Sequence, residues 1–368
     1  MANDDIFPSD ADCIQAMSTS TELARLQSAL ETEPSDTALR LALAEALTNE
    51  GRIEHAIALL EDARQHDAEP RLLLQLAALY RLNDGYQAAA DLLRPLTPTR
   101  HDRRIWESQY LSFLEADMYD EAISQLERWL QADPGNEMAS HLLPALKELP
   151  IPERAPKNYI VESFATAALN YDRFLKAQHY LGPELLLQLL TSNLGVAADF
   201  LRQADRRAVD LGCGTGALGR NLRNYATDLI GVDLSPEMLA FADKSNSYDQ
   251  LVCADLVDYL KDSPASSDLI VAADSFSYFG NLAQLIPLCF KALKKDGWLV
   301  FSLQEGPLAE DGYYLLPNGS FMHSPQYVIE QLGEAGLSGG NIRRVVMRKS
   351  KKQNHYALLV AVQRPDDH

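Results

Sequence analysis

Three glycines at alternate positions form the clearest candidate for a ligand-binding element. They lie in Ala208–Gly219, which reads AVDLGCGTGALG: an apolar run with Asp210, the glycines Gly212, Gly214 and Gly216, and then a helical pattern. This order predicts a strand, a tight turn and a helix, the layout of a nucleotide-type binding loop. Glycine suits such a turn because it adopts unusual φ/ψ values and lets a ligand approach bare backbone.

The acid at Asp210 indicates which class of ligand the loop would bind. A dinucleotide places its anionic pyrophosphate over the loop amides and the helix N-terminus. A carboxylate two residues before the first glycine would repel that phosphate. S-adenosylmethionine (SAM) has no phosphate, and it carries a sulfonium and an ammonium group. The acid together with the G-x-G-x-G pattern therefore favours SAM over NAD.

Acids also stand at the ends of the next predicted strands, and open α/β sheets bind ligands at that edge. The strands are predicted at 228–233, 250–254 and 268–273. Asp233 stands 17 residues after Gly216, a spacing that suits a carboxylate accepting both ribose hydroxyls. Asp255, with the backbone of Leu256, would accept from the adenine amine, and Asp210 would face the ammonium. Each acid alone would more often cap a helix or face solvent, but three in register with the loop indicate a site.

The motifs VDLGCGTG, GVDLS and CADL, in this order and spacing, resemble the class I SAM-dependent methyltransferases over Ser192–Gln363. The resemblance implies an α/β, Rossmann-like sheet of seven strands with the last strand antiparallel. It also implies that SAM becomes S-adenosylhomocysteine (SAH) without a metal. The residues that would contact the cofactor are Tyr171, Asp210, Gly212, Cys213, Gly214, Gly216, Asp233, Leu234, Met238, Asp255, Leu256, Ala273 and Asp274.

Three further motifs narrow the resemblance. SFATAALNYDRF, LGPELL and FMHSPQYV are similar to segments of bacterial methyltransferases of the type 11/12 group that carry tetratricopeptide repeats, and of their relatives without repeats. In that group the segment of Tyr171 lies over the cofactor, so the resemblance implies the same position here.

The methyl acceptor is expected beside the fourth strand, which ends in AADSFSYFG. Asp274, Ser275 and Tyr278 would face the methyl group, with sheet-end capping and packing as their alternative roles. The strand lacks the Asn/Asp-Pro-Pro-aromatic motif of methyltransferases that act on planar nitrogen. Its absence disfavours DNA bases and glutamine amides as acceptors.

The insert Gly306–Ser324 interrupts the last predicted strands, and its Pro317-Asn318-Gly319 turn predicts a hairpin over the substrate site. Its His323 is the candidate general base, although a histidine just before a helix is more often a cap or a packing residue. The basic run at 343–352 is interpreted as an exposed strand edge and turn. Binding of an anionic substrate group is the alternative interpretation of that run.

The N-terminal third repeats with a period of 33 residues. The repeated columns are Ala56, Ala89 and Ala122; Leu60, Leu93 and Leu126; and Leu47, Tyr80 and Phe113. A small residue lets two helices cross closely while larger ones fill the gap beside it. The columns resemble the tetratricopeptide repeat (TPR), with three repeats over Asp36–Gly135 and capping helices at Ser20–Leu30 and Glu137–Glu148. A plain helical bundle with an accidental period is the alternative.

These patterns divide the 368 residues into four segments. A loose tail (1–19) precedes an all-α TPR domain (20–148), and a proline-rich linker (149–157) leads to the methyltransferase domain (158–368). Residues 1–150 hold 27 acids and 12 bases, a balance of −15, while residues 151–368 hold 25 acids and 21 bases, a balance of −4. An acidic surface disfavours nucleic acid and anionic membrane as partners. Four scattered cysteines, no signal segment and no apolar run of membrane length predict a cytoplasmic protein.

Together these observations predict a cytoplasmic SAM-dependent methyltransferase that acts on a small molecule or a protein. The TPR domain would bind a protein partner or mediate dimerisation. Two other hypotheses stay open: a TPR adaptor whose fold binds SAM without catalysis, and a NAD-dependent oxidoreductase. Asp210 and the absence of a Tyr-x-x-x-Lys pair after the fourth strand count against the oxidoreductase.

Overall fold

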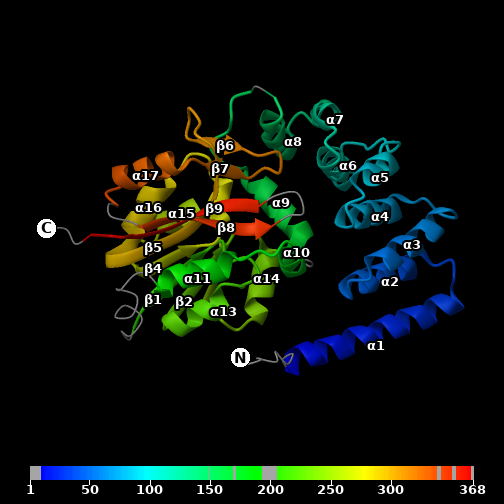
Figure 1. Cartoon of the computed structure of the whole chain (residues 1–368), viewed down its shortest axis with the longest axis horizontal. Coiled ribbons are helices and arrows are strands. Elements are labelled where there is room, and N and C mark those ends of the chain that lie inside the picture. The colour runs from blue at the N-terminus through cyan, green and yellow to red at the C-terminus, as the bar shows by residue number, and fades with distance from the viewer. Residues whose placement is uncertain are drawn as a thin grey trace, which may run out of the picture. The chain divides into compact units, whose positions relative to one another are not determined.

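The computed structural model describes residues 10–147, 149–168, 171–192, 205–337, 341–349 and 354–365. The chain divides into two compact units, Met1–Ala139 and Ser140–His368, and each is described by itself (Figure 1). The division falls before the proline-rich stretch 149–157, which the sequence predicts as the linker.

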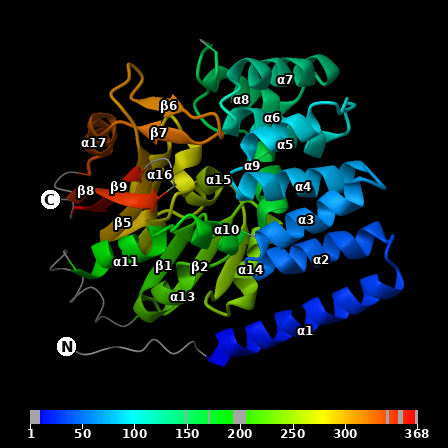
Figure 2. The same ribbon diagram turned by 45° about the vertical axis from the view of Figure 1, so that its right-hand side comes forward.

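Between residues 37 and 132, all of which are described, the first unit consists of three helix pairs. The pairs are α2 (Thr37–Asn49) with α3 (Ile53–Arg64), α4 (Pro70–Leu82) with α5 (Tyr86–Leu93), and α6 (Arg103–Glu115) with α7 (Tyr119–Ala132). Helices that are neighbours in the chain pack together, as Figures 1 and 2 show. Ala56, Ala89 and Ala122 are fully buried, as close helix crossing requires. The predicted repeats are therefore confirmed.

The flanking helices differ from the prediction in length. Helix α1 covers Asp10–Thr32 rather than Ser20–Leu30, so it begins inside the segment predicted as a loose tail. This stretch holds neither glycine nor proline, so nothing in it ends a helix. Helix α8 (Glu137–Leu142) is shorter than predicted because Pro144 follows it, and a 3₁₀ turn, η1 (Leu143–Ala145), continues the chain. Residues 1–9 and 148 lie outside the described residues.

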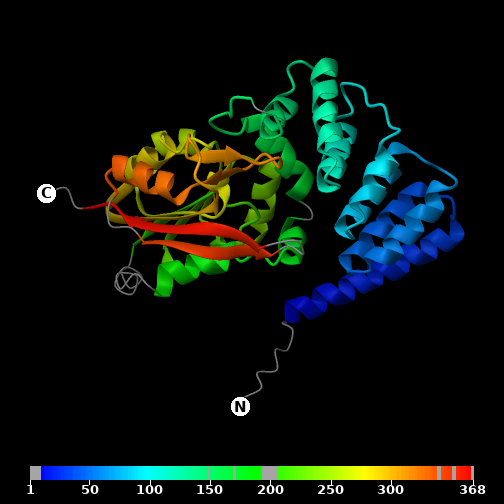
Figure 3. The ribbon, with the colours of Figure 1, turned by 45° about the horizontal axis from the view of Figure 1, so that its top comes forward.

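Within the described ranges, the second unit holds one sheet of nine strands. Its main strands are β1 (Arg207–Leu211), β2 (Asp228–Asp233), β3 (Gln250–Cys253), β4 (Ser267–Ala272), β5 (Leu293–Glu305), β8 (Asn341–Lys349) and β9 (Asn354–Gln363). The spatial order is β3-β2-β1-β4-β5-β9-β8, with β1 to β5 parallel and β9 antiparallel to both neighbours. This is the predicted seven-stranded α/β sheet, and Figure 3 shows the long β8–β9 pair in red.

The two remaining strands of the described sheet, β6 (Tyr313–Leu315) and β7 (Phe321–His323), form the hairpin predicted for the insert. Strand β7 pairs with the end of β5 through Gln304 and Glu305. The hairpin therefore lies at the carboxyl end of β5 and borders the edge of the sheet where ligands bind in such folds.

Helices cover both faces of the sheet (Figure 1). They are α15 (Leu256–Lys261), α16 (Leu285–Ala292) and α17 (Pro325–Glu334) on one face, and α11 (Gly182–Ser192) and α13 (Gly219–Leu222) on the other. The side chains of β1 alternate between the two faces, since Val209 and Leu211 join the first core and Ala208 joins the second. Asp210 consequently shares the face of Ala208.

Helices α9 (Lys157–Ala167), α10 (Tyr171–Ala177) and α14 (Pro236–Lys244) also belong to the second unit. Helix α14 begins as predicted, because Ser235 accepts a hydrogen bond from the Met238 amide and Pro236 occupies the first helical position. Helix α9 contacts α14. The predicted turn at Asp296-Gly297 lies inside β5, where Asp296 has a φ of 60° and the register with β4 jumps, so the turn is a bulge.

The proline-rich stretch, predicted as a linker, is hydrogen-bonded within the second unit. The amides of Gly280 and Asn281 both donate to the carbonyl of Glu153 at 2.8 Å, and the Ala155 amide donates to the carbonyl of Tyr278 at 2.9 Å. The segment is extended, as its prolines predict, and the residues between the prolines make its hydrogen bonds. It therefore lies along the residues that follow β4.

Candidate active site

The glycine loop between β1 and α13 has the backbone conformation that its sequence requires. Gly212, Gly214 and Gly216 have φ values of 75°, 54° and 84°, which L side chains rarely adopt. The amides of Gly212 and Cys213 both donate to the carbonyl of Val232, at 2.7 and 3.0 Å, and join the loop to the end of β2.

Gly212 and Gly214 are needed for different reasons. A Cβ on Gly212 would lie 2.3 Å from the Cβ of Ser275, so this glycine lets the loop pack against the residues after β4. A Cβ on Gly214 would meet no described atom within 4 Å. The backbone of Gly214 is therefore open to a ligand, which is the close approach that the sequence predicts.

Asp210 is fully buried near the end of β1. Its Oδ2 accepts a hydrogen bond from the Tyr248 hydroxyl at 2.7 Å, and its Oδ1 is buried without a partner among the described residues. Burial raises the pKa of Asp210 to about 7, the Tyr248 bond acts to lower it, and the charge of Asp233 acts to raise it. A buried acceptor without a partner costs about 1–3 kcal/mol, so this carboxylate is suited to gain a cationic partner.

Tyr248 is a site residue that the sequence does not reveal. Its ring fills the space beside three glycines: a Cβ on Gly219 would lie 2.2 Å from the ring, and Cβ atoms on Gly231 and Gly216 would lie 3.0 and 3.2 Å from it. Its hydroxyl holds Asp210. No motif or spacing connects residue 248 to the glycine loop, because the contact arises from the turn that precedes β3.

Asp233 joins the end of β2 to the glycine loop. Its Oδ2 accepts from the Gly214 amide and its Oδ1 accepts from the Ser235 amide, both at 2.9 Å. Burial raises the pKa of Asp233, and the hydrogen bonds from these amides oppose the shift. Because each carboxylate oxygen has two acceptor sites, Asp233 retains the capacity to accept the pair of ribose hydroxyls.

Asp255 has structural partners in addition to the predicted ligand, including Nζ of Lys157 at 3.8 Å. It caps α15 by accepting from the Val257 amide at 3.1 Å, and its Oδ2 lies 2.6 Å from Nη2 of Arg154. The guanidinium of Arg154 also lies over the Phe279 ring, 4.5 Å from its centroid. The alternative role of helix cap is thus observed, and a bond to adenine would have to share these carboxylate oxygens.

The apolar residues implied by the resemblance lie along one edge of the sheet. Cys213, Met238 and Leu256 are buried, whereas Leu234 and Ala273 are half-buried. They follow β1, β2, β3 and β4, so the parallel strands carry them all to their shared carboxyl edge.

Asp274, the acid after β4, has an uncommon backbone conformation. Its φ of 58° and ψ of −6° place it in the left-handed region, and such strain collects at functional sites. Its amide donates to Oγ of Ser302 at 2.9 Å, and its Oδ2 lies 3.3 Å from Nη2 of Arg348. Arg348 belongs to β8, so this contact joins two strands that are distant in the sequence.

Aromatic rings gather beside Asp274. Phe164 of α9 lies between Tyr171 and Tyr278, with ring centroids 5.7 and 5.6 Å from its own. Burial raises the pKa of Tyr278 to about 12, with Arg348 opposing the shift and Asp274 adding to it. Burial likewise raises the pKa of Tyr171. The structure thus brings the predicted residues Tyr171, Asp274 and Tyr278 together.

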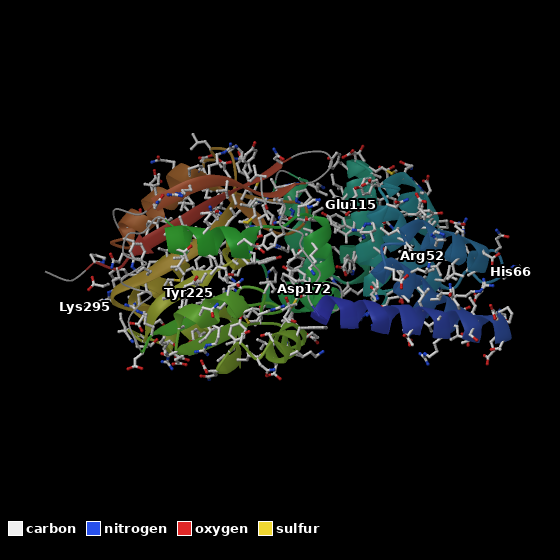
Figure 4. The ribbon with its side chains drawn as sticks, turned by 60° about the horizontal axis from the view of Figure 1, so that its bottom comes forward. Arg52, His66, Glu115, Asp172, Tyr225 and Lys295 are labelled. Atoms are coloured by element: carbon white, nitrogen blue, oxygen red, sulfur yellow. The ribbon has the colours of Figure 1, made fainter. Side chains whose placement is uncertain are left out.

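Helix α10 is tied to the glycine loop. Asp172, labelled in Figure 4, accepts a hydrogen bond from Oγ1 of Thr215 at 2.5 Å. The bond holds the first turn of α10, which begins with Tyr171, beside the loop. The resemblance to methyltransferases of the type 11/12 group likewise implies that the segment of Tyr171 lies beside the cofactor site.

His323 is not positioned as a general base, which corrects the sequence prediction. It is fully buried, and its Nε2 lies 2.8 and 3.0 Å from the carbonyl oxygens of Phe279 and Gly280. Carbonyls accept hydrogen bonds, so Nε2 carries the proton, and Nδ1 is buried without a partner among the described residues. Burial lowers the pKa of His323 to about 4. The histidine fastens the β6–β7 hairpin to the turn after β4.

The tip of the hairpin has a second attachment that the sequence does not reveal. Nε2 of His141 lies 2.9 Å from the carbonyl oxygen of Gly319, and the Tyr159 hydroxyl donates to the carbonyl of Asn318 at 2.7 Å. A Cβ on Gly319 would lie 2.1 Å from the Tyr159 hydroxyl, so the turn requires glycine there. Neither His141 nor Tyr159 stands in a motif.

Among the described residues, no group of three or more His, Cys, Asp and Glu side chains is placed to hold a metal ion. Among the described helices, none is both long enough and apolar enough to cross a membrane.

Two families match separate parts of the chain. Residues 209–301 match the family described as a methyltransferase domain, and residues 23–79 match the tetratricopeptide repeat family. The first match runs from β1 to β5 and includes the glycine loop. The second match includes α2, α3 and most of α4.

Curated relatives and solved structures resemble part of the chain. Malonyl-(acyl-carrier protein) O-methyltransferase of Pectobacterium atrosepticum is 28% identical over 159 residues, which cover 43% of this chain and 58% of that protein. Ubiquinone biosynthesis O-methyltransferase of Burkholderia vietnamiensis is 30% identical over 107 residues, which cover 27% of this chain and 44% of that protein. The chain thus spans about half the length of these relatives. The structure of Burkholderia thailandensis 1,6-didemethyltoxoflavin-N1-methyltransferase aligns at 16% identity and a TM-score of 0.45, over 59% of this chain and 94% of that one.

Proposed function

We propose that this chain, in which a methyltransferase domain follows tetratricopeptide repeats, transfers a methyl group from SAM to a small-molecule or protein acceptor. The observation that carries the proposal is the glycine loop itself. There the open backbone of Gly214 accompanies the buried Oδ1 of Asp210, which pairs with no group that the structure describes. A ligand that brings an ammonium group and no phosphate suits this combination.

The residues proposed to hold SAM stand at three strand ends. Asp210 would pair with the ammonium, Asp233 would accept from the ribose hydroxyls, and Asp255 beside Leu256 would accept from the adenine amine. When bound, SAM supplies a methyl group on a sulfonium for in-line displacement. The task of the chain is to align the acceptor with that methyl group, to exclude water and to take up a proton where the acceptor releases one.

Asp274 and Tyr278 are proposed to face the acceptor. Because His323 is committed to packing, Asp274 is the better group to hold a proton from the acceptor. Among the described residues, the Oδ1 of Asp274 accepts only one long hydrogen bond, from Oγ of Ser302 at 3.5 Å. The ring faces of Tyr171 and Tyr278 would stabilise the nearby sulfonium by cation–π attraction. The curated relatives named above are O-methyltransferases, which favours an oxygen acceptor.

The TPR unit is proposed to bind a protein partner or to mediate self-association, since such repeats present extended binding surfaces. A bidentate ion pair stiffens it: Arg81 of α4 donates to both carboxylate oxygens of Glu115 of α6, at 2.6 and 2.8 Å. Glu115 is labelled in Figure 4. Both roles leave the transferase chemistry to the second unit.

A turnover assay with methyl-labelled SAM tests the proposal. The full-length protein, SAM and a cell extract should yield SAH and a labelled product. Asp233→Ala should abolish both, whereas Asp243→Ala, at an exposed acid of α14, should not. Binding of SAM without turnover in any extract would favour the adaptor hypothesis instead. Failure of the full-length protein to bind SAM or SAH would overturn both.

A further inference from the structure

Arg348 differs from its neighbour Arg344 in the same basic run. Arg344 donates to both carboxylate oxygens of Glu305, at 2.7 and 2.9 Å. Arg348 makes one long contact, from Nη2 to Oδ2 of Asp274 at 3.3 Å, and its side chain is 27% exposed. Its other N–H groups have no hydrogen-bond acceptor among the described residues. Arg344 is thus held by two short bonds from its Nε, whereas Arg348 makes one long contact and keeps N–H donors without an acceptor among the described residues.

A bulge in β8 accompanies the inward position of Arg348. The pairing of β8 with β9 shifts between Val346 and Arg348. The intervening Met347 is buried, and its carbonyl accepts from the Leu181 amide at 3.0 Å. Bulges re-aim side chains beside active sites. Here the guanidinium of Arg348 lies over the Tyr180 ring, 5.8 Å from its centroid.

Three phenols share the surroundings of Arg348 and Asp274. Tyr171, Tyr180 and Tyr278 each interact with both charges, and none of their hydroxyls makes a hydrogen bond to a described residue. Burial raises the pKa of all three, so each hydroxyl keeps a proton to donate. The cluster therefore offers a guanidinium and three hydroxyl donors. Asp274 already faces the guanidinium, and the charges of Asp233 and Glu184 also act on the phenols.

We propose that the methyl acceptor carries an oxyanion, a carboxylate or a phosphate, which Arg348 binds together with the hydroxyls of Tyr171, Tyr180 and Tyr278. The planar guanidinium matches such groups with two parallel hydrogen bonds. Asp274 contacts only Nη2 of Arg348. The remaining N–H groups of the guanidinium can therefore bind the ligand. The inference rests on the proposed function, because it places the anion on the acceptor side of bound SAM.

The test uses the full-length protein saturated with SAH and four probes built on one ring: benzoate, phenyl phosphate, benzamide and benzylamine. Calorimetry gives the dissociation constant of each. At least one anion should bind about tenfold or more tightly than neutral benzamide, because hydrogen bonds to charged groups are the strong ones. The better anion tells whether the acceptor group is a carboxylate or a phosphate.

Variants assign the preference to the proposed residues. Arg348→Gln should remove the preference for the anion and leave SAH affinity unchanged, while the matched control Arg344→Gln should keep both. Arg348→Lys keeps the charge without the fork and should restore part of the preference. Tyr180→Phe keeps the ring and should weaken anion binding about fivefold.

Three results would overturn the inference: benzamide binding as tightly as the anions, no binding of either anion, or a preference for benzylamine. An unchanged anion preference in Arg348→Gln would overturn it as well. Absence of SAH binding by the unaltered protein would instead overturn the proposed function. If Arg348→Gln fails to bind SAH, the probe comparison in the unaltered protein and the Tyr180→Phe variant still test whether the site binds an anion.

Discussion

The glycine loop presents carboxylates to its ligand, whereas the ends of β4 and β8 present hydrogen-bond donors. On the loop side, Asp210 has an oxygen without a partner in the described part of the chain, and Asp233 has spare acceptor sites. On the other side, Arg348 has N–H groups without an acceptor among the described residues, beside three phenols. Unpaired polar groups are costly where water is excluded. We therefore propose that each side selects a ligand of opposite character, a cation-bearing cofactor at the loop and an anion-bearing acceptor beyond it.

The two sides also differ in how they are built. The loop is a contiguous stretch whose backbone bonds to β2 and whose glycines permit close packing. The acceptor side is assembled from α9, α10, the residues before α11, and the ends of β4 and β8. Substitutions at the loop should therefore disturb both fold and cofactor binding. Substitutions on the acceptor side should act mainly on the second substrate.

The largest effect is expected where the loop meets β4. Gly212→Ala adds a Cβ at a φ of 75° and 2.3 Å from that of Ser275, so it should destabilise the fold by about 2–4 kcal/mol. Gly214→Ala meets open space and should cost about 1 kcal/mol of backbone strain while weakening SAM binding. Thermal unfolding and SAM calorimetry measure the two effects. Equal melting temperatures for the two variants would contradict the division of roles.

His323→Phe separates packing from chemistry on the acceptor side. The change leaves the carbonyls of Phe279 and Gly280 without their donor and should lower the unfolding free energy by about 2 kcal/mol. The kcat of the folded variant should show no loss of the size that removing a general base causes, about 10²- to 10⁴-fold. A loss of that size in folded protein would restore His323 as the base.

The buried carboxylate of Asp210 gives the loop side a pH signature. The folded pKa of about 7 lies above the ordinary 3.8. The folded protein thus holds the extra proton between these values, and the stability from this group falls as pH rises from 3.8 toward 7. SAM needs the ionised form, so its affinity should rise about tenfold per pH unit below 7 and then level off. Tyr248→Phe removes a bond that lowers the pKa, and calorimetry should find the midpoint at higher pH.

Asp210→Asn is the control for that pH series, because it removes the titrating group and should flatten the dependence. If Tyr248→Phe leaves the midpoint unchanged, the Tyr248 hydroxyl does not position the Asp210 carboxylate. Cofactor affinity that falls as pH rises would contradict the assignment of Asp210 to the ammonium.

The smallest effect is expected at the attachment of α10. Thr215→Val removes the hydrogen bond to Asp172 and keeps the shape of the side chain. One such bond contributes about 1 kcal/mol, so the dissociation constant of SAM should rise about fivefold. Thr191→Val, at an exposed threonine of α11, is the matched control and should leave it unchanged. An unchanged constant in Thr215→Val would show that α10 does not restrain the cofactor.

The contrast between the two sides explains what the sequence could predict. The glycine loop was predictable because its conformation depends on residue types in one contiguous stretch. The position of Asp233 at the end of the next strand was predictable from the usual length of a βα unit. The strands and the TPR helices were predictable from periodicity for the same local reason. Tyr248 escaped prediction because its partner Asp210 lies 38 residues away.

Arg348 shows what limits prediction on the acceptor side. In the sequence it belongs to a basic run that is best interpreted as an exposed edge, and this interpretation suits Arg344, which pairs with Glu305. A bulge at Met347 distinguishes the two arginines, and no residue type in this stretch predicts a bulge. The sequence left His323 as a candidate base with packing as the alternative. Its position in the hairpin was predicted, whereas its contacts with the carbonyls of Phe279 and Gly280 were not.

Calorimetric titration of SAH into the full-length protein tests the central claim most directly. We predict stoichiometric binding that Asp233→Ala weakens about a hundredfold, because the change removes charged acceptors from the Gly214 amide and from the ribose. Asp243→Ala should bind as the unaltered protein does. Absence of binding, or equal affinity in Asp233→Ala, would contradict the account.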